Sequence, residues 1–522
     1  MSLTPSLDPA PRSGILAKER TADQPDGMPP DADLVGELER DGAQRRPVFH
    51  FTPRSGWMND PCGLTLHEGE HHLFYQHNPH ADVWGPMHWG HAVSPDSYTW
   101  QELPIALSPD HLGWIYSGSV VIDHDNSSGF GAGSMVAVFT HAGPAGQSQS
   151  LAWSNDNGRE WNLFGRNPVI APPAGEPDFR DPQVLWWERD GHWVMTIATG
   201  RRVRFYVSQN LREWDLASEL APMGVRDETA VETPDLFELP LDGTDETRWV
   251  LTFGVMSGGP AGGTGTRYLV GSFDGRSFEP AGMPEQSETA ALADHGPDFY
   301  AARSWSGTSI ADRSWVAWMG NWAYAERTPS SGWRGAMTCP RRLGLARTDE
   351  RIVLTQTPVA LPDHRLRRRV STGPLVLTPT SGDDPLRDLL QGAEVDAFDL
   401  SVRLRREHRG PCCLEILAVT GAEEWTSVVC DLETGVLTVD RMRSGPSEIH
   451  RELGGAFTVP VNPRDGVVDL RVLGDACSIE VLTDAGASIT TLVFPSRPTF
   501  TLGLRATGGP VRLEALDVYE IL

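Results

Sequence analysis

Three short motifs in the first half of the chain place a carboxylate beside or near a proline. They are Trp57–Gly63, Phe179–Pro182 and Val231–Phe237, which contain Asp60, Asp181 and Glu232. Proline restricts the residue before it to extended conformations, so it limits where such a carboxylate can point. Each motif alone is typical of an ordinary turn. Three carboxylates brought to one site, however, supply the groups that nucleophilic and acid–base catalysis use.

The elements around these motifs read as strands. Short runs of β-branched and aromatic residues alternate with Gly, Pro, Asp and Asn from Val48 to about Glu350, which is typical of β-structure. The clearest predicted strands are His72–Gln76, Ser117–Asp123, Met135–Thr140, His192–Ala198 and Arg248–Phe253. An all-β region of this length is compatible with a propeller of four-stranded blades, although no exact sequence repeat is visible.

The remaining segments differ from this region. Residues 1–45 are rich in Pro, Asp and Arg and predict an N-terminal extension, with one short helix expected near Ala32–Arg40. Residues 357–374, with the basic run Arg365–Arg369, predict a linker that is solvated or contacts both units. Alternation then resumes and predicts a β-sandwich over residues 375–522. Its predicted strands are Phe398–Arg405, Thr426–Asp431, Val467–Val472, Ser478–Leu482 and Val511–Tyr519.

Composition narrows the choice of partners. A chain of 522 residues is too long for one ordinary core, so two folded units are expected. Its 70 acidic residues against 44 Lys and Arg give a formal net charge of −26. Such a surface repels phosphate backbones and anionic lipids, so we expect neither nucleic acid nor membrane as a partner. The oligomeric state is left open.

The six cysteines lack the spacing of a metal site and are too sparse for a disulfide scaffold, so most are expected as buried thiols. A bridge between Cys430 and Cys477 stays open for an exported protein. No apolar stretch approaches the length of a membrane span, and residues 1–30 lack the apolar core of a signal peptide. The chain is therefore expected in the cytoplasm, or secreted if a leader has been removed.

Taken together and in this order, the three motifs resemble those of glycoside hydrolase family 32. Trp57–Gly63 resembles the family signature Trp-Met-Asn-Asp-Pro-Asn-Gly, Arg180–Pro182 its Arg-Asp-Pro motif, and Glu232–Pro234 its Glu-Cys-Pro motif. Further similar stretches are Phe74–Pro79, His88–Ser94, Tyr116–Ser119, Asp298–Ala302, Asn321–Tyr324 and Trp333–Thr338. The resemblance is strong from Phe49 to Leu343 and weaker over Leu470–Pro495.

The resemblance implies an all-β fold, with a five-bladed β-propeller over residues 46–356 followed by a C-terminal β-sandwich. It also implies a retaining enzyme that cleaves or transfers β-fructofuranosyl units of sucrose, inulin or levan. In that family pattern Asp60 is the nucleophile, Glu232 the general acid/base, and Asp181 the stabiliser of the charged transition state. A retaining mechanism needs one ionised and one protonated carboxyl group, and we expect Glu232 to hold the proton.

Fructose contacts implied by the family pattern are Asn59, Gln76, Trp84, Ser117, Arg180 and Trp322. Amides and hydroxyls suit a polyol, and indole faces suit its CH-rich side. Arg180 is expected to keep the neighbouring Asp181 ionised and can itself fork toward hydroxyls or an acid. His88 and His91 are more typical of structural histidines than of metal ligands, so no metal and no cofactor is expected.

The chain departs from the family pattern at four positions, namely Cys62, Tyr116, Thr233 and Cys339. All three acids remain, so these changes bear on specificity more than on activity. Three functions stay open. The first is hydrolysis of a terminal fructosyl unit, and the second is fructosyl transfer, including an intramolecular transfer that releases a difructose dianhydride from levan. The third is fructan binding without catalysis, which the three retained acids disfavour.

Overall fold

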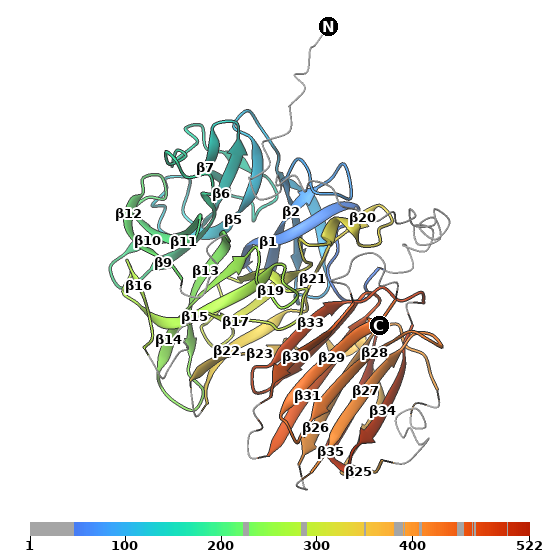
Figure 1. Cartoon of the computed structure of the whole chain (residues 1–522). Coiled ribbons are helices and arrows are strands. Elements are labelled where there is room, and N and C mark those ends of the chain that lie inside the picture. Colours follow the sequence, from blue (N-terminus) through green and yellow to red (C-terminus); the bar gives the residue numbers. More distant parts are fainter. Residues whose placement is uncertain are drawn as a thin grey trace, which may run out of the picture.

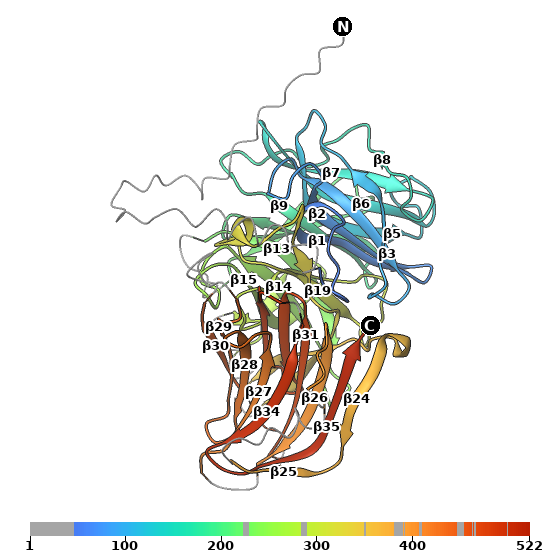
Figure 2. The same ribbon diagram turned by 90° about the vertical axis from the view of Figure 1, so that its right-hand side faces the viewer.

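The computed structural model describes residues 46–222, 229–282, 290–348, 351–379, 390, 392–406, 410–445, 454–461, 463, 466–497 and 499–522. The predicted N-terminal extension, with the helix expected near residues 32–40, lies outside this range. Figure 1 shows two β-rich bodies packed against each other, and Figure 2 shows the same arrangement from the side.

Five antiparallel sheets form the first body. The first sheet has β1 (Gly56–His67), β2 (Glu70–Asn78), β3 (His88–Ser94) and β4 (Gln101–Leu107). The second has β5 (Trp114–Asp123), β6 (Ser134–Gly143), β7 (Gly146–Ser154) and β8 (Asn162–Leu163). The third has β9 (Arg180–Trp187), β10 (His192–Thr199), β11 (Arg202–Ser208) and β12 (Asp215–Leu220). The fourth has β13 (Val231–Pro240), β14 (Thr247–Val255), β15 (Gly265–Phe273), β16 (Phe278–Pro280) and β17 (Ala291–Leu292). The fifth has β18 (Tyr300–Ser304), β19 (Ser314–Met319), β21 (Ala336–Met337), β22 (Arg341–Arg347) and β23 (Ile352–Pro358).

The first strand of each sheet lies innermost. β1, β5, β9, β13 and β18 contact one another in succession, and β18 contacts β1, so the ring closes. The late strand β20 (Trp333–Arg334) pairs in parallel with β1 and ties the last blade to the first. This arrangement is the predicted five-bladed propeller. The predicted strands of the region lie within β2, β5, β6, β10 and β14.

Two sheets form the second body. One has the order β24 (Leu366–Thr372), β35 (Val511–Ile521), β26 (Phe398–Arg405), β31 (Val467–Asp475), β32 (Ser478–Thr483) and β33 (Ser488–Leu492), with β25 (Leu375–Leu377) also on β35. The other has the order β30 (Ala456–Pro460), β29 (Val436–Arg443), β28 (Trp425–Asp431), β27 (Cys413–Val419) and β34 (Thr501–Thr507). Alternate side chains of both sheets, such as Leu400 and Ile416, are buried in one core, as in the predicted β-sandwich.

The sandwich begins before residue 375. Inside the predicted linker, 357–374, the structure has the 3₁₀ helix η3 (Asp363–Arg365) and β24, and β24 pairs with β35. The arginines of the basic run hid the alternation of this edge strand, because they lie on its exposed positions. Arg365 contacts both bodies, since it donates hydrogen bonds to the carbonyl oxygens of Val48 (2.9 Å) and Leu522 (3.1 Å).

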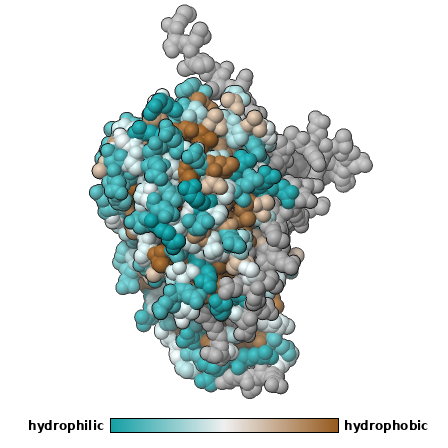
Figure 3. Space-filling view, turned by 90° about the vertical axis from the view of Figure 1, so that its left-hand side faces the viewer, coloured by the Kyte–Doolittle hydropathy of each residue, from teal (hydrophilic) through white to brown (hydrophobic). Residues whose placement is uncertain are grey.

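The structure also bears on the expected state of the cysteines, the character of the surface and the expectation of no membrane span. All six cysteines are free thiols, so Cys430 and Cys477 do not form a bridge. Hydrophilic residues dominate the face shown in Figure 3, and hydrophobic ones lie in small groups. In the part of the chain that the structure describes, no helix is long and apolar enough to cross a bilayer.

Candidate active site

The three acidic motifs lie in innermost strands of the propeller. Asp60 is in β1, Asp181 in β9 and Glu232 in β13. The pairing of β1, β9 and β13 with their neighbours shifts register close to the acids. Asp181 and Thr233 have positive φ angles of 64° and 45°. The motifs therefore occupy bulged strands rather than the separate turns that their prolines suggested, and the bulges aim the carboxylates.

Asp60 is held from two sides. Its Oδ1 accepts a hydrogen bond from Asn59 Nδ2 (3.0 Å), and its Oδ2 accepts one from Ser117 Oγ (2.8 Å). Burial, together with the negative charges of Asp181 and Glu232, raises the pKa of Asp60 to about 7, although the two hydrogen bonds lower it. The contributions of Asp181 and Glu232 to this pKa are consistent with their lining the same cavity as Asp60.

Asp181 is fixed mainly through backbone contacts. Its Oδ2 accepts a hydrogen bond from the Thr233 N–H (2.9 Å), and its own N–H donates to Thr140 Oγ1 (3.1 Å). Its carbonyl oxygen accepts a hydrogen bond from Arg303 Nη2 (3.1 Å). Burial raises its pKa to about 6, whereas the positive charges of Arg180 and Arg303 act in the opposite direction.

Arg180 binds Glu232 rather than Asp181. Its Nη2 and Nε donate to Glu232 Oε1 at 2.7 and 3.1 Å, and Nη1 pairs with Asp178. Its Nε is 4.0 Å from Asp181 Oδ2. Both residues line that cavity, and the guanidinium of Arg180 crosses to the carboxylate of the next blade. The geometry thus shows the expected fork toward another acid, and the nearby charge of Arg180 also favours the ionised form of Asp181, because it lowers the pKa of that carboxyl.

Glu232 accepts a second contact from a residue that the sequence analysis did not assign. The hydroxyl of Tyr300, in β18, donates to Glu232 Oε2. Both carboxylate oxygens of Glu232 therefore accept hydrogen bonds, one from Arg180 and one from Tyr300. Protonation of Glu232 stays a prediction.

All nine predicted site residues line one cavity of about 330 Å³. They are Asn59, Asp60, Gln76, Trp84, Ser117, Arg180, Asp181, Glu232 and Trp322. The cavity combines a few carboxylates, amides and hydroxyls with aromatic walls, which is the composition of a small-molecule site.

The two tryptophans are supported by other rings. Trp84 packs edge-to-face on Trp114, with ring centroids 5.2 Å apart. Trp322 stacks on Trp57 at 5.7 Å and touches Trp318 at 5.0 Å. Both indoles line the cavity while their far sides are packed, so they form rigid walls for a ligand.

The sequence analysis missed several residues of the cavity. Gln147, Met256, Tyr324, Glu326 and Arg327 line it and were not assigned. Tyr324 and Tyr300 lie in stretches that resemble the family, so a signal existed for both. Gln147 had none: its Oε1 accepts hydrogen bonds from the N–H of Phe179 (2.7 Å) and from Arg180 Nη1 (3.3 Å), across blades.

The two histidines and three of the four departures from the family pattern, Cys62, Thr233 and Cys339, do not line the cavity, whereas the fourth departure, Tyr116, does. His88 pairs with the Pro86 carbonyl oxygen (2.9 Å), and His91 stacks on Phe74 at 4.0 Å. Cys62 belongs to an apolar cluster beside β1, and Cys339 contacts Glu480 at 3.4 Å. Among the described residues, no three His, Cys, Asp or Glu side chains are grouped so that they could hold a metal ion.

Comparisons with known proteins agree with the geometry. Residues 50–358 match the model described as glycosyl hydrolases family 32 N-terminal domain, and residues 365–520 match the family 32 C-terminal model. A levanase of Bacillus subtilis is 40% identical over 484 residues, which are 91% of this chain and 70% of that protein. An extracellular exo-inulinase of Aspergillus awamori is 34% identical over 519 residues, covering 91% of this chain and 94% of the relative.

Solved structures are similar over nearly the whole length. An exo-inulinase of Aspergillus awamori superposes with a TM-score of 0.85 at 33% identity, covering 92% of this chain and 98% of that one. A β-fructofuranosidase of Schwanniomyces occidentalis in complex with fructosyl-erythritol gives 0.79 at 28% identity, covering 91% and 97%.

Proposed function

Because the chain belongs to glycosyl hydrolase family 32, it is a glycoside hydrolase that cleaves β-fructofuranosyl linkages of fructans or sucrose, and we propose the roles of its acids. Asp60 is the nucleophile, Glu232 the general acid/base, and Asp181 the stabiliser of the transition state. The observation that carries this assignment is their placement in one cavity, where Asp181 and Glu232 both raise the pKa of Asp60.

In the first step, ionised Asp60 attacks the anomeric carbon of the terminal fructosyl unit. The bond to the leaving oxygen breaks, and Glu232 gives that oxygen a proton. Asn59 and Ser117 donate hydrogen bonds to Asp60 and orient it for the attack. Positive charge develops on the sugar ring, and Asp181 stabilises this charge while it binds ring hydroxyls.

In the second step, the ester between Asp60 and fructose is hydrolysed. Glu232, now ionised, takes a proton from water, and the hydroxyl attacks the anomeric carbon and releases Asp60. Two inversions retain the configuration, so the first product is β-fructofuranose. Arg180 and Tyr300 hold Glu232 in place through both steps.

Contacts to the sugar are proposed on the same cavity. Gln76, 3% exposed, donates from Nε2 to the carbonyl oxygen of Ile115 (3.1 Å), which fixes the direction of its amide. Trp84 and Trp322 supply apolar walls, and Asn59, Ser117 and Arg180 supply polar contacts. Such a site recognises a polyol by convergent hydrogen bonds and a CH-rich face by the indoles.

Product analysis tests the function. Sucrose, inulin and levan are incubated with the full chain, and the products are separated by chromatography. Free fructose is the expected product, and oligomers or dianhydrides would show that a sugar hydroxyl replaces water. Nuclear magnetic resonance of the first-formed fructose reports the anomer, and an α-anomer would contradict the retaining mechanism.

Substitution of the acids tests their roles. Glu232→Gln keeps the size of the side chain but cannot transfer a proton, so kcat should fall by about 10²–10⁴-fold. Asp60→Ala should abolish turnover because no covalent intermediate can form. Asp294→Asn is a matched control, since Asp294 is a buried carboxylate paired with Arg341 and does not line the cavity. Full turnover of either acid variant would contradict the assignment.

The place of action is also a proposal. The Aspergillus relatives are named extracellular exo-inulinases, and we propose that this chain likewise acts on fructan outside the cell. Fructan-degrading activity in the culture medium, absent from the cell lysate, is the expected distribution. The reverse distribution would contradict it.

A further inference from the structure

A buried arginine of the sandwich reaches into the propeller. Arg441, on β29, is 3% exposed, and its Nη1 donates to Asp298 Oδ2 at 2.7 Å. Its Nη2 donates to the hydroxyl of Tyr324 at 3.1 Å. That hydroxyl in turn donates to Asp298 Oδ1. Arg441, Asp298 and Tyr324 thus form a closed triangle in which one member comes from the sandwich and two from the propeller.

The sandwich also holds Asp298 and Arg441 through its other sheet. Asp298 Oδ2 accepts a hydrogen bond from the Leu492 N–H (2.8 Å), and Arg441 Nη1 donates to Thr491 Oγ1 (2.8 Å) and to the Leu492 carbonyl oxygen (2.9 Å). Burial alone would lower the pKa of Arg441, but Tyr324 and Asp298 raise it above its usual value. Removal of a buried guanidinium that is paired in this way leaves several buried groups without a hydrogen-bond partner at once.

The two propeller residues of the triangle, Asp298 and Tyr324, connect Arg441 to the cavity. Tyr324 lines it, together with its near neighbour Trp322. Asp298 lies two residues before Tyr300, whose hydroxyl contacts Glu232. Arg441 is therefore connected, through single side chains, to an aromatic wall of the cavity and to the strand that carries the Glu232 contact.

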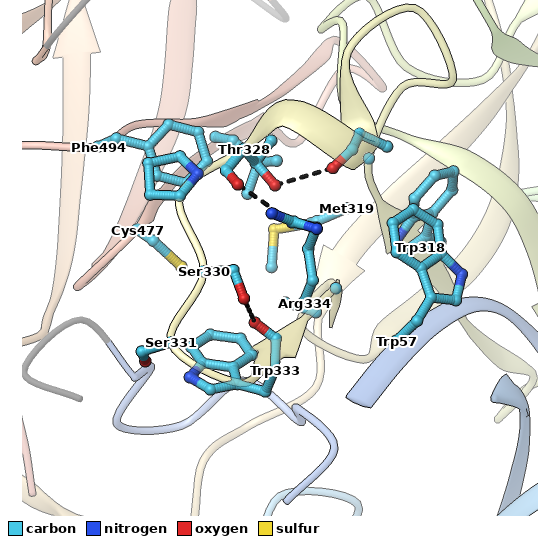
Figure 4. A pocket seen from close by; sticks show the side chains of 16 residues that line it. Trp57, Trp318, Met319, Thr328, Ser330, Ser331, Trp333, Arg334, Cys477 and Phe494 are labelled. Atoms are coloured by element: carbon cyan, nitrogen blue, oxygen red, sulfur yellow. Dashed lines mark hydrogen bonds between the residues drawn. The ribbon is translucent and has the colours of Figure 1, made fainter. Parts of the chain in front are cut away.

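Apolar packing joins the same parts. Tyr324 belongs to one buried cluster with Cys477, Leu492 and Phe494 of the sandwich. A small cavity of about 40 Å³ lies where the two bodies meet. Figure 4 shows Cys477 and Phe494 on one side of it and Trp57 and Trp318 on the other. These two tryptophans are the rings behind Trp322. The interface between propeller and sandwich thus lies directly behind Trp322 and Tyr324, the two aromatic residues that line this side of the cavity.

We propose that Arg441 is a positioning residue for the fructosyl site: the sandwich uses it to fix the Trp322–Tyr324 wall through Asp298 and Tyr324. It touches no reacting atom. The proposal rests on the proposed function and assigns the sandwich a part in shaping the site. It predicts that loss of Arg441 weakens sugar binding as well as stability.

A second buried cluster at the same interface provides the control. Glu480, in β32, binds His50 (2.7 Å) and Arg341 of the propeller and is fully buried. None of these three residues lines the cavity. Glu480→Gln therefore weakens the interface as Arg441→Met does, but it leaves the wall in place.

The test compares KM with thermal stability in the full-length chain. We expect Arg441→Met to raise the KM for sucrose about tenfold, which corresponds to about 1.4 kcal/mol. Arg441→Lys, which keeps the charge but cannot donate to Asp298 and Tyr324 as a planar fork, should give an intermediate KM. Glu480→Gln should lower Tm while KM stays within about twofold of the wild type, because the contacts between the cavity and the substrate are unchanged.

Fructose binding, followed by tryptophan fluorescence, gives a readout independent of turnover. The Kd for fructose should rise in Arg441→Met and in Tyr324→Phe, and Tyr324→Phe also serves if Arg441→Met does not fold. An unchanged Kd in both, or an equal change in Glu480→Gln, would overturn the proposal. If the wild type binds fructose but releases none from sucrose, inulin or levan, the proposed function fails, and the Kd values still decide the role of Arg441.

Discussion

At the proposed nucleophile, Asp60, two hydrogen bonds oppose the effect of burial on the pKa. Burial, Asp181 and Glu232 raise the pKa of Asp60 to about 7, and the donors Asn59 and Ser117 lower it. An attacking carboxylate must be ionised, so these donors decide how far into the acid range the enzyme can work. Ser117 is the simpler of the two to test, because its Oγ donates directly to Asp60 Oδ2 at 2.8 Å.

Ser117→Ala should move the acidic limb of the kcat/KM profile to higher pH. Loss of the donor raises the pKa of Asp60, and one pKa unit corresponds to about 1.4 kcal/mol, the worth of a good hydrogen bond. The measurement is kcat/KM for sucrose across the acid range. Ser119→Ala is the matched control, since Ser119 lies two positions along β5 and its Oγ accepts from the Val184 N–H (3.0 Å) instead. If the acidic limb of the kcat/KM profile lies at the same pH in both variants, the proposed role of Ser117 is refuted.

Single residues show how far the sequence could predict the site. The resemblance to the family implied the three acids and six further residues, and all nine line the cavity. The partner of Arg180 could not be read in the same way. Its neighbour Asp181 was the obvious choice, whereas the guanidinium crosses to Glu232, which is 52 positions away in the sequence. Contacts across blades leave no local signal.

At the scale of elements, the innermost strands are irregular where the acids lie, and one arginine braces them. Arg303 is 2% exposed, and its guanidinium donates to the carbonyl oxygens of Asp181 (3.1 Å) and Pro234. It also contacts Gln183 Oε1 at 3.4 Å. Arg303 thus ties together the backbone that follows two of the three acids, and its charge lowers the pKa of Asp181.

Arg303→Met should cost both stability and activity. Each carbonyl oxygen left buried without a donor costs about 1–3 kcal/mol, so Tm should fall by several degrees. The pKa of Asp181 should rise, because a cation that favours its ionised form is lost, and kcat should fall in the acid range. Arg303→Lys restores a charge and should recover part of both losses. The proposal for Arg303 would not survive a methionine variant as active and as stable as the wild type.

The sequence predicted strands better than their irregularities. Runs of β-branched and aromatic residues between turn residues located β2, β5 and β14, whose positions are mostly buried on both faces. These runs could not show that Asp181 and Thr233 have positive φ, since non-glycine residues rarely adopt this conformation and only the surrounding blades hold them there. The edge strand β24 was taken for a linker because its arginines broke the alternation.

At the scale of the molecule, two sets of buried charges join propeller and sandwich. One is the Arg441 triangle. The other has His50 between Asp475 (2.8 Å) and Glu480 (2.7 Å), with Arg341 bound to Glu480 and to Asp294 (2.9 Å). The contacts that cross the interface join residues more than a hundred positions apart in the sequence, so neither set could be predicted from it. Charges buried in this way depend on pairing, which makes the interface sensitive to pH.

His50 should make that sensitivity measurable. Burial alone would lower its pKa, but the hydrogen bonds to Asp475 and Glu480 raise it to about 9 from its usual value of 6.5. Protonated His50 therefore stabilises the fold fully below pH 6.5, and this stabilisation is lost as the pH rises through about 9. A shift of this size corresponds to about 3 kcal/mol.

Comparison of the wild type with His50→Gln isolates this contribution. The difference in Tm between them should be largest below pH 6.5 and should shrink steadily toward pH 9, because glutamine does not titrate. On the acid side, Arg341 and His50 outweigh burial and lower the pKa of Glu480 to about 2, so the interface should keep its charge pairing through the range in which ordinary glutamates become neutral. Thermal melts of both proteins at a series of pH values provide the measurement. A difference in Tm that stays constant from pH 6 to pH 9 would mean that His50 is neutral in the folded chain, and the interface would then be held by Arg341 and its two acids without it.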